Sequence, residues 1–294
     1  MNIRKLLRLY DQGDRDFEGV DLCGADLRGV LLMGVNLKGA NLRGADLTRA
    51  FLIKSDLSGA QMNWANLSFV KMNEVKLIET ELTRANLSGA FMVKSLLPGA
   101  KMSGADLMGA NLRGANLWGA NLCGSQLERV NLRDANLMGV NFKWANLSEA
   151  RLMGAMLYGS SLNFANMSRA WLKGVDLGGF NLEGVNFRRA KLTAATLEGA
   201  NLTGANLTDA QLNRVNLQGA DLSGANLERA CLEDANLTGA ILRRTQLSEA
   251  NMSGTKLYGV DFSDVRHSVG IESELSDCPK GSAKGDRAFY SAAV

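Results

Sequence analysis

The chain has 294 residues, with 33 basic and 30 acidic side chains and a formal net charge of +3. This near balance excludes a strong overall electrostatic attraction to nucleic acid or to basic partners. The sequence contains no secretory signal and no apolar run close to the roughly 18 residues that a membrane-spanning helix needs. Its four cysteines are scattered, which suits a reducing compartment. We therefore expect a cytoplasmic protein.

Residues 1–15 are predicted to form a short amphipathic helix that caps the fold. Leu6 and Tyr10 fall on its apolar side and Arg4 and Arg8 on the other, and Gly13 is expected to end it. A cap of this kind covers the open edge of a β structure, which would otherwise pair with other chains. A basic amphipathic helix can also lie on a membrane. With only about two turns, this one favours the capping interpretation, and we expect no membrane binding.

From residue 16 to residue 265 the sequence repeats every five residues. Every fifth residue from Phe17 to Phe262 is Leu, Phe or Met, which we call the centre of its repeat, and there are about 50 such repeats. Two residues before each centre stands a small or β-branched residue, usually Ala, except at Arg15 and Phe180. Helices repeat near 3.6 residues and strands near 2. The period therefore predicts a solenoid in which centres and small residues point inward.

The two residues after each centre are predicted to turn the chain. Gly is frequent at the second of them, and a type II turn needs a positive φ there. The residue before the centre is mostly Asn or Asp, as at Asn116 and Asp26. Rows of carboxylates could suggest catalysis. Short polar side chains at a turn bind the local backbone, however, and stacked Asn side chains form ladders, so we interpret these rows as structural.

The unit A-N-L-x-G, which recurs through residues 110–124, resembles the repeat of the pentapeptide-repeat family, and the resemblance covers residues 16–265. It implies an all-β solenoid: a right-handed quadrilateral β-helix with four repeats per coil, about 12 coils and a short N-terminal capping helix. With coils about 4.8 Å apart, the solenoid would be roughly 60 Å long. The lead-in to the first repeat is similar to that of single-domain members common in cyanobacteria.

Two parts of the chain depart from the pattern. Phe180 follows Gly178 and Gly179, which predicts a relaxed turn with the ring pointing outward or filling a widened corner. The period is lost from Arg266 onward. Residues 266–294 are predicted to be the remnant of a C-terminal cap followed by a flexible tail.

The residues needed for common catalytic and metal sites are not arranged for them. The single histidine, His267, lies beyond the repeats, without a Ser-His-Asp or Cys-His partner. Cysteines lack the spacing of a zinc site, and the glycines follow the period of the turns rather than a phosphate-binding motif. We therefore expect neither an enzyme nor a cofactor or metal site.

Outward positions 20 residues apart should line up in columns, and some columns carry apolar side chains that the fold does not require. The predicted partner-binding residues, called the apolar patch below, are Phe51, Ile53, Phe91, Val93, Leu96, Trp118, Met138 and Tyr158. Secondary candidates are Trp64, Trp144 and Phe164. Aromatic residues and Met are enriched at interface centres. The alternative is that their side chains only stack and stiffen the solenoid. A column with Arg129, Arg169 and Arg229, interrupted by acidic residues, is interpreted as a solvated face.

The functional hypothesis is a non-catalytic scaffold that binds another protein through outward side chains. Self-association into a homodimer, through an end or through the apolar patch, is a variant of this hypothesis, and nucleic acid is not expected as a partner. The resemblance also implies an alternative, because some family members mimic duplex DNA and modulate a type II topoisomerase (gyrase). Mimicry needs a strongly acidic surface, whereas residues 16–265 carry nearly equal numbers of acidic and basic residues.

Overall fold

The computed structural model describes residues 1–265, which fall into two units. The first unit is Met1–Val175 and the second begins at Asp176. The expected cap remnant and tail at 266–294, together with His267, lie outside the described residues.

The helix α1 spans Ile3–Asp11 and is the only helix within residues 1–265. The Asn2 side chain caps its start by accepting the Lys5 amide at 2.8 Å. Leu6 is completely buried, Tyr10 is half-buried and the basic side chains are exposed. Gly13, with a φ of +97°, follows the end of the helix. The predicted amphipathic helix is therefore confirmed.

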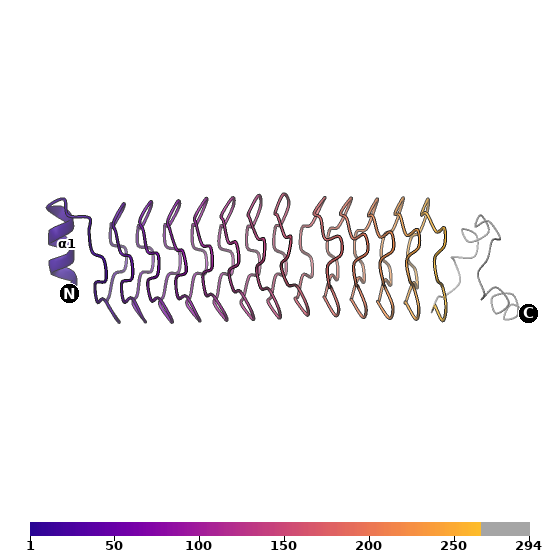
Figure 1. Cartoon of the computed structure of the whole chain (residues 1–294), viewed down its shortest axis with the longest axis horizontal. Helices are drawn as coiled ribbons and strands as arrows, with labels where there is room; N and C mark the ends of the chain where they lie inside the picture. The colour runs from indigo at the N-terminus through magenta and orange to yellow at the C-terminus, as the bar shows by residue number, and fades with distance from the viewer. Residues whose placement is uncertain (266–294) are drawn as a thin grey trace, which may run out of the picture. The chain divides into compact units, whose positions relative to one another are not determined.

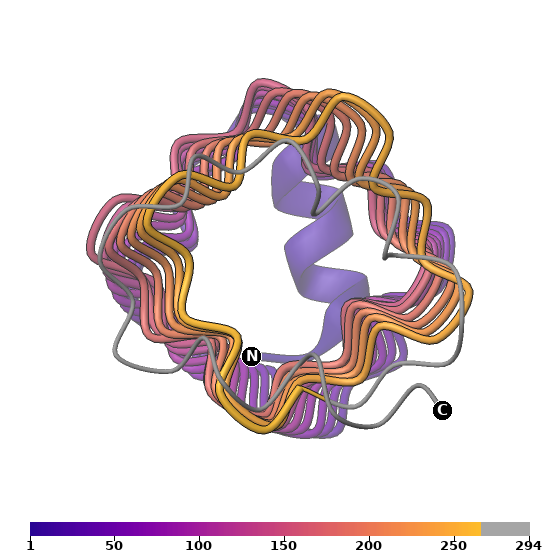
Figure 2. The same cartoon turned by 90° about the vertical axis from the view of Figure 1, so that its right-hand side faces the viewer.

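Contacts join α1 to the first coils of its own unit, across whose N-terminal end it lies (Figure 1, Figure 2). The N-terminal ammonium group donates to the carbonyl of Asp21 at 2.9 Å. The Tyr10 hydroxyl accepts the amide of Met33 at 3.2 Å, and the Arg15 guanidinium lies 3.8 Å from the centre of the Tyr10 ring. The helix is thus held by backbone groups of the solenoid as well as by burial of Leu6.

Each unit is a stack of coils of 20 residues. Parallel bridges join the residue before each centre to its counterpart 20 residues later, such as Asn116 to Asn136 in the first unit and Asn216 to Asn236 in the second. Viewed end-on, each coil has four sides (Figure 2). The bridges are single residues, and no longer strand forms within residues 1–265. This architecture confirms the predicted β solenoid.

Every amide of a typical repeat finds an acceptor, as residues 116–120 illustrate. The amides of Asn116, Leu117 and Gly119 donate to carbonyls of neighbouring coils at 2.8–2.9 Å, and that of Ala120 closes the turn onto the Leu117 carbonyl at 2.9 Å. The remaining amide, that of Trp118, donates to the side-chain Oδ1 of Asn116 at 3.1 Å. Backbone polar groups must be paired when buried, and this arrangement explains why Asn or Asp precedes so many centres.

The interior is filled by the centres and the small residues. Between Leu22 and Leu247 every centre is at most 2% exposed, including the fully buried Phe142 and Phe187. Burying one such side chain contributes about 1.5–3 kcal/mol. The buried hydroxyl of Ser55 is paired with the backbone: it donates to the Leu32 carbonyl at 2.9 Å and accepts the Val35 amide at 3.3 Å.

The second turn residue adopts a positive φ, as predicted. Glycines such as Gly119 (+65°) do so readily, but many other residues share the conformation, among them Trp64 (+59°) and Arg129 (+58°). Non-glycine residues are strained there by roughly 1–2 kcal/mol. Around Phe180 the turn is not relaxed, contrary to the prediction. Its amide still donates to the Leu177 carbonyl at 3.3 Å, Gly179 has a φ of +67°, and the Phe180 side chain is half-buried.

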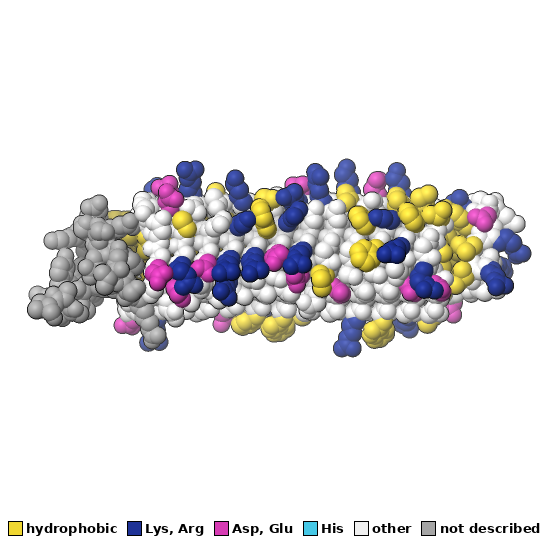
Figure 3. Space-filling model, turned by 180° about the vertical axis from the view of Figure 1, so that it is seen from behind, with side chains coloured by type: hydrophobic (Ala, Val, Ile, Leu, Met, Phe, Trp, Pro, Cys, Tyr) yellow, Lys and Arg dark blue, Asp and Glu magenta, His cyan; other side chains and the backbone are white. Residues whose placement is uncertain are grey.

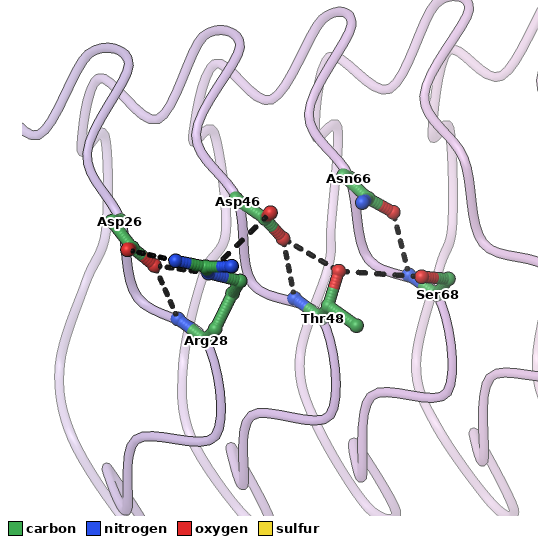
Figure 4. A network of polar contacts seen from close by, with 6 residues as sticks. All are labelled: Asp26, Arg28, Asp46, Thr48, Asn66 and Ser68. Carbon is green, nitrogen blue, oxygen red and sulfur yellow. Dashed lines mark hydrogen bonds and ion pairs between the residues drawn. The ribbon is translucent and has the colours of Figure 1, made fainter.

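Figure 4 shows the side chains that support these turns in three successive coils of the first unit. Asp26, Asp46 and Asn66 each accept the amide two residues later, at 3.0–3.3 Å. Arg28 adds two hydrogen bonds to Asp26, at 2.6 and 2.8 Å, and lies 3.9 Å from Asp46. The carboxylates of this row thus accept hydrogen bonds from backbone amides and from Arg28, which agrees with the structural interpretation of the row.

Replacing Leu117 with Arg should destabilise the first unit by several kcal/mol, because the charge would be buried without a partner between stacked coils. The measurement is the free energy of unfolding from denaturant titration. Trp118→Arg is the matched control, since that side chain is 58% exposed and its replacement should have little effect. Equal stability of Leu117→Arg and the parent would contradict the inward position of the centres.

The pKa of Asp26 is expected at about 2, below its ordinary value of 3.8, chiefly because Arg28 donates side-chain hydrogen bonds to the carboxylate. A lowered pKa favours the folded state above the unfolded value, and this contribution is lost as the pH falls through about 2. Carboxyl ¹³C NMR titration would measure the pKa. Arg28→Gln should return it toward 3.8, whereas the control Arg43→Gln should not. Titration of Asp26 near 3.8 in the parent would contradict the pairing.

Candidate partner-binding surfaces

The outward side chains of the first unit lie on four faces, each named here after one of its centres: the Leu27, Leu32, Leu37 and Leu42 faces. The Leu32 face, for example, comprises the outward residues beside Leu32, Leu52, Met72 and the centres that follow at intervals of 20 residues up to Leu172. In every coil a face presents the residue before the centre and the two turn residues after it. Side chains of one column therefore lie in successive coils, about 4.8 Å apart.

One part of the predicted apolar patch forms a column on the Leu37 face. The carbonyls of Trp118, Met138 and Tyr158 accept amides of the adjacent coils at 2.9–3.0 Å, which places the three residues in consecutive coils. Trp118 is 58% and Tyr158 80% exposed, while Met138 is half-buried. Leu96, which is also exposed, precedes the centre in the coil next to that of Trp118. This column presents two large aromatic side chains to solvent.

The other part lies on the Leu32 face, where the patch is interrupted. Phe51 and Ile53 occupy one coil and the exposed Phe91 and half-buried Val93 another, but the coil between them carries Lys71 and Asn73. The Lys71 ammonium lies 3.2 Å from the centre of the Phe91 ring. The predicted patch is thus two apolar groups separated by a cation on this face, plus the column on the Leu37 face.

Where an apolar residue precedes a centre, the turn lacks the side-chain acceptor that Asn or Asp provides at that position in other repeats. Phe91 cannot accept the amide of Val93, which donates instead to Asn73 Oδ1 of the neighbouring coil at 2.9 Å. Beside Leu96 no acceptor is needed, because residue 98 is a proline and has no amide hydrogen to donate. These local substitutes show that apolar side chains at this position are accommodated by the fold rather than required by it.

The secondary candidates share a column on the Leu42 face. Trp144 and Phe164 stack in adjacent coils, with ring centres 6.5 Å apart and planes 9° from parallel. Trp64 is 61% exposed and separated from them by Arg84, Gly104 and Gly124. It borders a shallow groove whose other lining residues are Arg43, Gly59, Gln61, Asn63, Glu79 and Glu81.

Charges on the Leu27 face pair with one another. Glu149 accepts Arg129 at 2.9 Å and Arg169 at 3.3 Å, and these hydrogen bonds lower the pKa of its carboxyl. In the second unit Asp209 is likewise paired with Arg189 and Arg229. Alternating blue and magenta groups are visible in Figure 3. The column interpreted as a solvated face is therefore a series of exposed ion pairs, each worth little to stability.

Sequence reasoning missed the basic character of the Leu32 face. Its basic side chains are Lys54, Lys71, Lys94, Arg113, Arg133, Arg151 and Lys173, against the acidic Glu74 and Asp134. The 20-residue spacing that predicts the aromatic columns also predicts this excess of basic residues, when the charges of each face are counted separately.

Within residues 1–265, no group of three or more His, Cys, Asp and Glu side chains is placed to hold a metal ion. In the same range no helix is long and apolar enough to cross a membrane.

A family model described as "Pentapeptide repeats (8 copies)" matches overlapping segments of the chain. They are residues 16–49, 31–68, 65–104, 76–114, 105–143, 135–174, 170–209, 210–230 and 230–266. No curated protein sequence matches the chain.

Among the solved structures that match the chain are three other proteins. HetL, a pentapeptide repeat protein involved in regulation of heterocyst differentiation in the cyanobacterium Nostoc sp. strain PCC 7120, is 34% identical, with 89% of this chain and 95% of HetL covered and a TM-score of 0.35. Rfr23 from the cyanobacterium Cyanothece 51142 is 28% identical, over 53% of this chain and 92% of its own, with a TM-score of 0.22. The plasmid-mediated fluoroquinolone resistance protein QnrB1 is 17% identical. The match covers 85% of this chain and 97% of the QnrB1 chain, with a TM-score of 0.35.

The repeat matches span most of the sequence, and the identity to HetL extends over nearly all of that protein. The chain belongs to the pentapeptide-repeat family, whose solved members are right-handed quadrilateral β-helices.

Proposed function

We propose that this protein is a non-catalytic scaffold that binds another protein through outward side chains of its first unit. The observation that carries the proposal is the exposure of Trp118 (58%) and Tyr158 (80%) in one column of the Leu37 face. Neither side chain fills the core or supports a turn, and large aromatic residues are enriched among the residues that dominate binding energy at protein interfaces. The apolar patch and the secondary candidates Trp64, Trp144 and Phe164 are the proposed contact residues.

The proposal gives α1 the role of an N-terminal cap. Its contacts to Asp21 and Met33 and the complete burial of Leu6 support that role, because they cover the first coil of a stack whose edge would otherwise be open. A cytoplasmic location is part of the same proposal, and the free thiols of Cys23, Cys123 and Cys231 support it.

Changing both Phe91 and Trp118 to Glu should abolish partner binding or self-association while the protein stays folded. Both side chains are exposed, so their loss should leave the core intact, whereas two carboxylates would disrupt an apolar interface. The measurement is affinity capture from native lysate with mass spectrometry, combined with light scattering for oligomeric state and circular dichroism for folding.

Phe69→Glu with Tyr258→Glu is the matched control pair, since both rings are exposed and lie outside the apolar patch. The control should keep every partner that the parent captures. A Phe91 and Trp118 variant that unfolds, or that keeps all partners, would show that these rings are structural and that the partner surface lies elsewhere.

The gyrase alternative predicts inhibition of DNA supercoiling, and we expect none at low micromolar protein. Mimicry of DNA requires dense negative charge, but the first unit has no strongly acidic face and its Leu32 face is basic. A supercoiling assay, with a known gyrase inhibitor as positive control, measures this directly. Strong inhibition by the folded protein would make modulation of gyrase the favoured function and the protein-binding scaffold the alternative.

A further inference from the structure

Basic side chains of the first unit are concentrated on the Leu32 face. Of its charged residues, seven are basic (Lys54, Lys71, Lys94, Arg113, Arg133, Arg151 and Lys173) and two are acidic (Glu74 and Asp134), an excess of five. From residue 16 to residue 175, no other face has an excess of either sign above two. The nearly neutral repeat region thus contains one strongly basic surface.

Most of these cations are not neutralised within the protein. Glu74 lies 4.0 Å from Lys54, and Asp134 lies 3.6 Å from Arg113. Among residues 1–265, no carboxylate forms an ion pair with Arg133, Arg151 or Lys173. The Nε atom of Arg133 is buried and has no hydrogen-bond partner in that range. Arg113 and Arg133 occupy the same column in adjacent coils, so like charges are stacked.

The same face changes character along the stack. Its early coils carry Leu31 (54% exposed), Met33 (45%), Phe51, Ile53 and Phe91 (37%), and its three arginines begin only at Arg113. Figure 3 shows hydrophobic side chains gathered toward the N-terminal end of the visible surface. The early coils therefore offer apolar contacts between the ammonium groups of Lys54, Lys71 and Lys94, and the later coils offer guanidinium groups, which bind carboxylates in a bidentate manner.

We propose that the Leu32 face binds an acidic protein segment that also carries apolar anchor residues. The anchors pack on Phe51, Ile53 and Phe91, and the carboxylates of the segment pair with Arg113, Arg133 and Arg151. The inference rests on the proposed protein-binding function and names the chemistry of the partner. An acidic segment matches both ends of the face, because it neutralises stacked like charges and covers exposed apolar side chains.

Other anionic partners fit the face less well. Duplex DNA and RNA bind chiefly through phosphate contacts, which the exposed apolar side chains of Leu31, Met33 and Phe91 on this face cannot make. A membrane surface is laterally uniform, whereas the arginines and most of the apolar side chains occupy different coils of the face. A protein segment can place different residues against each end.

The test is selection of a random 16-residue peptide display library on the full-length protein. Enriched peptides should combine net negative charge with at least two large apolar residues. A selected peptide should bind the parent more weakly as salt is raised, because exposed ion pairs are screened. The triple variant Arg113→Glu, Arg133→Glu and Arg151→Glu should lose at least about tenfold in affinity, measured by fluorescence anisotropy.

The matched control is Arg43→Glu, Arg84→Glu and Lys143→Glu, which changes the net charge equally on the Leu42 face. It should keep the affinity of the parent. Equal losses in both triple variants, enrichment of neutral or basic peptides, or no enrichment would overturn the inference. Preferential binding of the parent to phosphatidylserine vesicles or to a 20-base-pair duplex would also overturn it. If the inference fails while lysate capture still depends on Phe91 and Trp118, the protein-binding function stands and only the partner chemistry is wrong.

Discussion

The amide groups of each repeat constrain the fold, because every one of them needs an acceptor and residues 1–265 form only single-residue bridges instead of long strands. Three donate between coils and one closes the turn, as in residues 116–120. The fifth depends on a side chain, commonly Asn or Asp before the centre. Once these bonds are fixed, the centre must point inward and the next two residues outward. Sequence period, square coil and solid core are therefore consequences of one hydrogen-bonding scheme.

This scheme separates the positions that build the fold from those that do not. Substituting a centre changes the packing of three coils, whereas a residue such as Trp118 touches solvent over more than half of its surface. The residue before the centre is intermediate, because an apolar side chain there gives up a hydrogen bond. Phe91 is accommodated by Asn73 and Leu96 by the proline that follows it. Apolar residues at these positions are informative about binding because the hydrogen-bonding scheme does not favour them.

Most of the fold could be predicted from the sequence, because its signal is repeated and local. The inward centres, the positive φ at the second turn residue, the role of Asn and Asp, and the amphipathic helix before the repeats all follow from residue type and spacing. Other features depend on contacts between coils, which the period alone does not specify. Lys71 lies over Phe91 and divides the predicted patch, and the Tyr10 hydroxyl binds the Met33 amide. The turn at Phe180 stays closed because its backbone bonds are those of every other repeat.

Net charge was the least informative property of the sequence. It averages over faces that point in different directions, and a partner meets only one of them. Exposed charges separated by more than about 8–10 Å are largely screened at physiological salt, so the acidic residues of the Leu37 face do little to offset Arg133 and Arg151. The Leu27 face shows the contrasting case, in which Glu149 forms ion pairs with both adjacent arginines in its own column. In a four-sided solenoid each face therefore acts as a separate electrostatic surface, and a neutral total is compatible with selective binding of an acidic partner.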